Sequence, residues 1–150
     1  MNGDGALSVD TVLVPVDGSP ESADAAEFAV AVAGRYDATI HALYVLDESV
    51  SHAIEIGDVS EDDVADEHRA FIGDIRELAV DEGVDFGVSS AYGFSTHTKL
   101  QHPGSVILDC ADQVDADFLV IPRERGNAAE VLEKAAEYVL LYASQPVLSV

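Results

Sequence analysis

The chain has 150 residues, 48% of them hydrophobic, which is the size of one domain with a buried core. Seven Lys and Arg against 29 Asp and Glu give a formal net charge of -22. This charge opposes binding to a nucleic-acid backbone or to an anionic membrane surface, so neither is an expected partner. The acidic residues are spread along the whole chain, which is typical of a halophilic protein surface adapted to a salt-rich cytoplasm.

Cysteine content and apolar segment length favour a cytoplasmic protein. Cys110 has no second cysteine with which to form an intramolecular disulfide, and its place on the apolar face of a helix predicts a buried side chain. No segment approaches the roughly 20 apolar residues that a membrane-spanning helix needs. Residues 1–10 lack the layout of a signal peptide and are expected to form a flexible N-terminal tail, followed by one domain over residues 11–150.

The first predicted element is a short buried strand of mostly aliphatic residues, 12–16, which ends at Asp17. Helix-starting residues follow at once. Gly18 can adopt dihedrals closed to other residues, Ser19 can accept a capping hydrogen bond, and Pro20 suits the first helical position. Asp17 is therefore expected at the carboxyl end of a strand, which is the edge where open α/β sheets bind their ligands.

The rest of the chain alternates between apolar strand patterns and amphipathic helix patterns. Further strands are predicted at residues 39–46, 84–91, 117–121 and 147–150. Helices are predicted at residues 21–35 and 61–83, from residue 103 onward, and at 128–143. This order predicts a single α/β domain with a five-stranded parallel sheet, helices on both faces and right-handed crossovers.

The apolar helix faces and the irregular segments lead to further expectations. Phe28 in the first helix and Leu140 in the last lie on apolar faces and are expected to be buried. Residues 48–60 have no clear period and are expected to form a mobile loop over the site. Residues 92–101 form a mostly polar stretch.

Motifs for several enzyme and cofactor-binding classes are missing from the sequence. No glycine fingerprint for dinucleotides, no P-loop and no nucleophile elbow is present. His97 and His102 lie among hydroxyl residues, an arrangement that a metal site or a hydroxyl–histidine pair would use. The favoured interpretation is that these polar residues cap the helix that begins near Pro103.

Asp17 and two arginines are the candidate ligand-binding residues, and each has a structural alternative. Asp17 either faces a ligand or accepts a hydrogen bond from the backbone of its own turn. Arg123 and Arg125 lie just beyond a predicted strand end, where guanidinium groups can hold phosphate oxygens. The alternative is that they pair with carboxylates such as Glu124 or Glu130 in this acidic chain.

Several motifs, in this order along the chain, resemble those of the universal stress protein family. They are Val-Leu-Val-Pro-Val-Asp-Gly-Ser at 12–19, Ala-Leu-Tyr-Val-Leu-Asp at 42–47, Ala-Asp-Phe-Leu-Val-Ile at 116–121 and Pro-Val-Leu-Ser-Val at 146–150. The resemblance implies a Rossmann-like five-stranded parallel sheet of order 3-2-1-4-5. It also implies a homodimer that forms by pairing of the last strands, between Val147 and Val150.

The resemblance further implies a nucleotide site with one altered half. Family members that bind ATP place the adenine near positions that match Pro15, Val16, Asp17 and Val45, and these positions are intact. They hold the phosphates with Gly-x2-Gly-x9-Gly-Ser/Thr. Here Pro122 matches the first glycine, Gly126 matches the second, and Glu133-Lys134 replaces the Gly-Ser pair. Proline has no amide hydrogen for a phosphate, and a glutamate repels one.

These observations lead to two functional expectations. The first is a dimeric, non-catalytic stress-response module with lost or weakened ATP binding. The alternative is an adenine-nucleotide sensor that binds ATP or AMP at the carboxyl ends of strands 1 and 4, with Asp17, Val45, Arg123, Arg125 and Gly126 at the ligand. A nucleotide hydrolase is the least supported class, because no candidate base or metal cluster stands out in the sequence.

Overall fold

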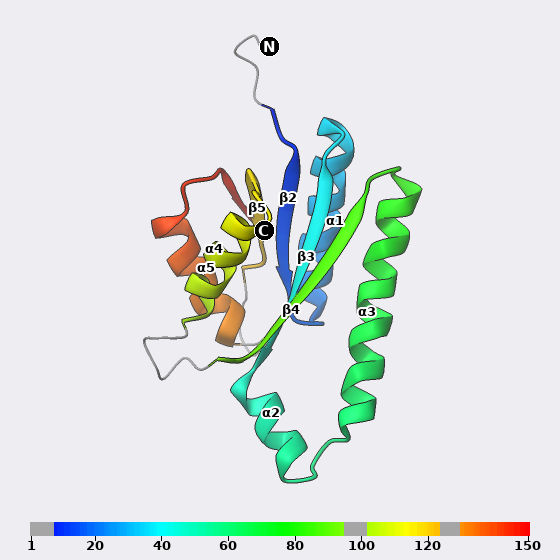
Figure 1. Ribbon diagram of the computed structural model, residues 1–150, viewed down its shortest axis with the longest axis vertical. Coiled ribbons are helices and arrows are strands. Elements are labelled where there is room, and N and C mark those ends of the chain that lie inside the picture. The colour runs from blue at the N-terminus through cyan, green and yellow to red at the C-terminus, as the bar shows by residue number, and fades with distance from the viewer. Residues whose placement is uncertain (1–7, 95–101, 124–129) are drawn as a thin grey trace.

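A computed structural model describes residues 8–94, 102–123 and 130–150 of the chain (Figure 1). Five strands form one sheet of order β4-β3-β2-β5-β6, and every neighbouring pair in it is parallel. The strands are β2 (Thr11–Val16), β3 (Thr39–Asp47), β4 (Phe86–Phe94), β5 (Phe118–Ile121) and β6 (Val147–Ser149). In chain order this is 3-2-1-4-5, so the predicted α/β architecture and strand order are confirmed.

The helices form layers on both faces of this sheet (Figure 1). They are α1 (Pro20–Tyr36), α2 (Glu48–Glu55), α3 (Glu61–Asp81), α4 (Pro103–Gln113) and α5 (Glu130–Tyr142). Helices α1 and α3 lie on one face, and α4 and α5 lie together on the other. Within the described ranges, none of these helices has both the length and the hydropathy that crossing a bilayer requires.

Two apolar clusters, one on each face, make up the core. The first cluster joins β2 and β3 to α1 and α3 and contains Val12, Val14, Val16 and Tyr44. The second cluster joins the same strands to α4 and α5. Side chains of one strand alternate between the clusters, so each central strand is buried on both faces, as expected for a parallel sheet.

Two expectations of buried helix residues are wrong. Phe28 is 51% exposed, because α1 packs on the sheet through the small residues Ala25, Ala29 and Ala33, which form a narrower stripe than the apolar pattern suggests. Leu140 is 55% exposed. In α5 the fully buried positions follow the spacing of Leu132, Ala135 and Val139, and Leu140 lies about 100° further round the helix.

The expected loop at 48–60 is also wrong for its first part, because Glu48–Glu55 form α2 at the carboxyl end of β3. A helix of only eight residues offers about two turns, which is too short for a hydrophobic period to stand out. Strand β4 extends to Phe94, so it includes the start of the stretch expected to be polar, and residues 95–101 lie outside the described ranges.

The fold includes two residues that the sequence assigned to the tail. Val9 is 2% exposed, and the backbone N–H of Asp10 donates to both carboxylate oxygens of Asp117, at 3.1 and 3.0 Å. The N–H of Thr11 donates to the same carboxylate at 3.0 Å. This side chain at the start of β5 therefore holds the start of β2 in place.

Candidate functional site

The turn at the carboxyl end of β2 is built from the residues that sequence chemistry singled out. The N–H of Ser19 donates to Asp17 Oδ1 at 2.9 Å, and the Ser19 hydroxyl accepts from the N–H of Ser22 at 3.2 Å. Ser19 is thus the N-cap of α1, and Pro20 is its first residue. One Asp17 oxygen satisfies its own turn, which is one of the two roles that the sequence left open.

Ser22 in the first turn of α1 stabilises this turn through two hydrogen bonds with its backbone, a role that the sequence did not indicate. Its side chain is fully buried, accepts from the N–H of Asp17 at 3.3 Å and donates to the carbonyl oxygen of Ser19 at 3.0 Å. The turn is consequently held by hydrogen bonds at both ends. Its backbone shape is defined before any ligand arrives.

The expected adenine-binding residues lie on two different faces of the sheet formed by β2 and β3. Pro15 pairs with Leu43 in the parallel register, and Val16 pairs with Tyr44. The Val16 side chain is fully buried in the first cluster, whereas Val45 is 2% exposed and belongs to the second. Alternation along a strand places Pro15 and Asp17 on the Val45 face. The Val16 side chain therefore points away from that face.

Tyr44 approaches the turn from the neighbouring strand. A Cβ at Gly18 would lie 2.7 Å from Tyr44 Oη and 3.7 Å from Cζ, so the hydroxyl lies directly against the glycine. Gly18 also has a φ of +87°, which L side chains rarely adopt. Both observations require glycine at this position. The sequence signal for the contact was the strand position of Tyr44, next to Val45 but on the opposite face.

Helix α3 covers the Tyr44 ring on its other side. The His68 ring stacks on it with centroids 4.0 Å apart, and Phe71 meets it edge-on at 6.0 Å. Burial raises the pKa of the Tyr44 phenol, and the carboxylates of Asp17 and Glu67 raise it further. Tyr44 is therefore a neutral phenol beside two carboxylates.

The end of β5 forms the other side of the candidate site, at the point where the sheet connections reverse direction. Pro122 follows the strand and is buried, and Arg123 is exposed. The backbone N–H of Arg123 donates to the carbonyl oxygen of Val150 at 2.6 Å, which extends the pairing of β5 with β6. Arg125 and Gly126, the remaining predicted phosphate-binding residues, lie outside the described ranges.

Of the two histidines expected near α4, the one that the structure describes, His102, has the predicted capping role. Nδ1 of His102 accepts from the N–H of Gly104 at 3.0 Å, which makes His102 the N-cap of α4. Its ring also stacks on Tyr138 of α5 at 4.6 Å. His97 lies outside the described ranges. Among the residues that are described, no group of three His, Cys, Asp or Glu is arranged to hold a metal ion.

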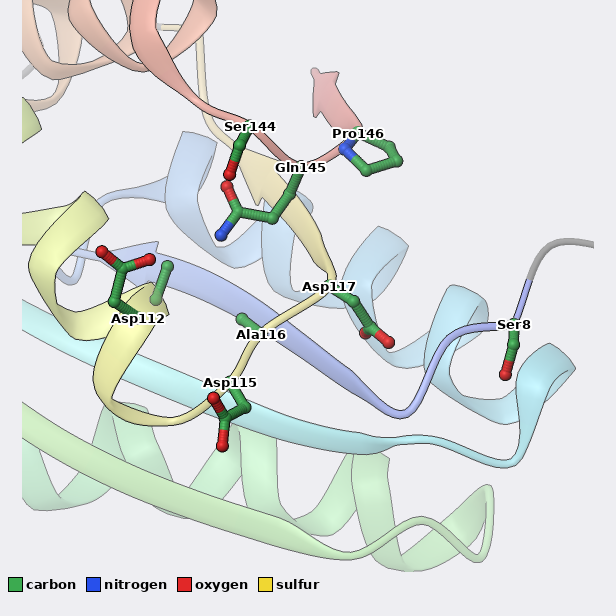
Figure 2. Close-up of a pocket in the computed structure, with 9 residues that line it drawn as sticks. Ser8, Asp112, Asp115, Ala116, Asp117, Ser144, Gln145 and Pro146 are labelled. Atoms are coloured by element: carbon green, nitrogen blue, oxygen red, sulfur yellow. The ribbon is translucent and has the colours of Figure 1, made fainter.

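An open depression of about 500 Å³ lies at the opposite end of the sheet, by the start of β5 (Figure 2). Its walls include Asp112 from the last turn of α4, Asp115 from the segment between α4 and β5, and Gln145 from the turn before β6. Asp117 also lines it, but both of its carboxylate oxygens accept backbone N–H groups. The depression is therefore lined in part by the residue that connects the start of β2 to the start of β5, and it lies away from the Asp17 turn.

Comparison with known proteins finds one matching family and one relative of similar sequence. A model of the universal stress protein family matches residues 8–150 of the chain. A universal stress protein of Methanocaldococcus jannaschii is 26% identical over 146 residues, which cover 93% of this chain and 80% of that protein.

Two solved structures show the same fold with a nucleotide bound. A universal stress protein in complex with cAMP has a TM-score of 0.64 and 21% identity, over 96% of this chain and 98% of the other. The universal stress protein of Archaeoglobus fulgidus in complex with dAMP has a TM-score of 0.62 and 19% identity, also over 96% and 98%. At these identities the likeness to solved structures concerns the fold.

Proposed function

Because the chain belongs to the universal stress protein family, we propose that it is a non-catalytic module that binds adenosine monophosphate at the Asp17 turn and in which ATP binding is weakened. The proposal combines an adenine half of the site that matches the family with a phosphate half that departs from it. Two fold neighbours supply support, since one was solved with cAMP and the other with dAMP, and each of these nucleotides carries one phosphate.

The observation that carries the proposal is the loss of backbone donors directly after β5. A triphosphate is usually held by free N–H groups of a glycine-rich loop at a helix N-terminus. Pro122 has no N–H, and the N–H of Arg123 already donates to Val150 at 2.6 Å. The first two positions of the loop therefore offer no amide to a phosphate chain.

Charge acts in the same direction. The protein carries a formal net charge of -22, so each additional phosphate of the ligand adds repulsion. The exposed Arg123 side chain is the described cation beside β5 that can offset the charge of one phosphate. A nucleotide with one phosphate thus requires the fewest backbone donors and the least positive charge from the altered half of the site.

Calorimetric titration of the purified protein in molar KCl tests this proposal directly. We expect AMP to bind about tenfold more tightly than ATP with Mg²⁺, and Arg123→Ala to lower AMP affinity about fivefold. Arg35→Ala removes an exposed arginine from the last turn of α1 and serves as the matched control. Tighter binding of ATP than of AMP, or no binding of either nucleotide, would contradict the proposal.

A homodimer through β6 is the second part of the proposed function. Strand β6 is an edge of the sheet, and three large apolar side chains lie just before it at the end of α5. Leu140, Leu141 and Tyr142 are 55%, 77% and 65% exposed. An unpaired edge strand beside exposed apolar residues favours association with a second copy of the chain.

Backbone geometry provides a sharp test of the dimer. Val150 uses its N–H and carbonyl for β5, so alternation directs the N–H groups of Val147 and Ser149 toward the open edge. Val147→Pro removes one outward donor and leaves the pairing with β5 intact. Sedimentation in molar KCl should give a dimer for the wild type and a monomer for the variant, with unchanged far-UV circular dichroism. A wild-type monomer would refute this part.

A further inference from the structure

We propose that Tyr44 and His68 are positioning residues through which helix α3 holds the Asp17–Gly18–Ser19 turn in its ligand-binding shape. That a ligand binds at this turn rests on the proposed function above. The link from α3 through Tyr44 to the turn is present in the free protein. Tyr44 lies between the turn and α3, and it contacts both.

The contact with the turn is made by the hydroxyl group. The position of a Gly18 Cβ would be 2.7 Å from Tyr44 Oη but 3.7 Å from the ring carbon Cζ. A phenylalanine would fill the core equally well but would leave the turn without this support. Tyr44 as a whole is only 6% exposed and packs in the first cluster, so the hydroxyl has a defined position.

The contact with α3 is made by the ring face. His68 stacks on Tyr44 at 4.0 Å with an interplanar angle of 28°, and Phe71 braces the ring edge-on at 6.0 Å. Stacked and edge-on aromatic pairs stabilise packing beyond the area they bury, and they also define ring orientation. A shift of α3 would therefore displace the ring, and the hydroxyl would move with it.

Electrostatics keeps the Tyr44 hydroxyl protonated where it meets the turn. The negative charge of Asp17 acts on the phenol strongly enough to raise its pKa, after the effect of burial. Asp17 Oδ1 in turn accepts the N–H of Ser19 at 2.9 Å. The hydroxyl that α3 holds through the Tyr44 ring thus lies against Gly18, between Asp17 and Ser19, which gives α3 a route to the affinity of the site.

Amide hydrogen exchange of the nucleotide-free protein, followed by NMR in molar KCl, tests the link. His68→Ala and Tyr44→Phe should each accelerate exchange of the Ser19 N–H by about tenfold, while the Leu13 N–H in the core of β2 changes much less. His68→Phe keeps a stacked ring and should retain slow exchange. Tyr36→Phe removes the same hydroxyl from a tyrosine that is 42% exposed on α1, and is the matched control.

A titration of the same variants with AMP separates this inference from the function on which it rests. His68→Ala should lower AMP affinity about fivefold, and His68→Phe should retain it. Equal acceleration at Ser19 and Leu13, or no acceleration at Ser19, would overturn the inference. If the wild type fails to bind AMP, the proposed function is lost, and the exchange rates still decide whether α3 holds the turn.

Discussion

Replacement of Gly18 by alanine perturbs the candidate site with a cost that can be divided into two parts. The first part is backbone strain, because a φ of +87° costs an L residue about 1–2 kcal/mol. The second part is a collision, because the new Cβ would lie 2.7 Å from Tyr44 Oη. Overpacking of this kind costs about 1–3 kcal/mol, so the free energy of unfolding should fall by about 2–5 kcal/mol in total.

The two parts separate because the collision involves a single atom. In a Tyr44→Phe background the nearest remaining atom of the ring is Cζ at 3.7 Å, an ordinary contact distance, so only the strain should remain. Gly18→Ala should then cost about 1–2 kcal/mol, which leaves a coupling energy of about 1–3 kcal/mol between the two positions. Gly57→Ala is the control, since its φ is +83° and a Cβ there would meet nothing within 4 Å.

Urea unfolding in molar KCl, followed by far-UV circular dichroism, measures each free energy. The four proteins of the Gly18/Tyr44 cycle are compared with Gly57→Ala in both backgrounds. The Gly57→Ala cost should be the same in the wild-type and Tyr44→Phe backgrounds. The reasoning fails if Gly18→Ala costs no more than Gly57→Ala in the wild type, or if Tyr44→Phe does not reduce the Gly18→Ala cost.

Packing and titration give three more predictions. Gly104→Ala should destabilise by about 2–3 kcal/mol in the same urea assay, because its Cβ would lie 2.4 Å from Cβ of Tyr138 and push α4 from α5. Burial lowers the pKa of both His41 and His68. Their unfolded forms take up protons first, so the stability they contribute is complete above pH 6.5 and declines as the pH falls below it. Burial raises the pKa of Cys110, so this thiol should react with Ellman's reagent only after urea unfolding.

Each of these predictions has a control. Gly73→Ala on α3 would meet nothing within 4 Å and should not destabilise the protein. For the pH effect, a His41→Gln/His68→Gln protein should lose less stability than the wild type between about pH 7.5 and pH 5.5, and equal losses would contradict it. Rapid reaction of Cys110 in the native protein would show that α4 does not bury it.

The sequence predicted the features that depend on neighbouring residues. The Asp17 turn follows from adjacent residues, since Ser19 caps α1 and Pro20 begins it. The strand order came from the resemblance to a family, and the capping role of His102 came from its place before Pro103. The turn and the cap depend on contacts within a few positions, whereas the strand order depends on distant pairings and was available only through the family motifs.

Features that depend on distant contacts could not be predicted in the same way. The stack of His68 on Tyr44 joins a helix to a strand, and no local pattern indicates which face of α3 meets which ring. The exposure of Phe28 likewise depends on how closely the small residues of α1 approach the sheet. Arg125 and Gly126 stay untested predictions, because they lie outside the described ranges.

The central position of β2 has a consequence for the biogenesis of the protein. Among the described strands β2 is synthesised before the others, yet one of its two neighbours is β5, and the Asp117 carboxylate accepts the N–H of Asp10 across 107 residues of sequence. Until β5 is synthesised, the apolar β2 has an open edge that is able to pair with another nascent chain. A strand pairing over such a separation also slows folding. β2 thus gains its second neighbour only late in synthesis. Mutations at Asp117 should therefore lower the yield of folded protein in translation assays to a greater extent than their effect on the free energy of unfolding predicts.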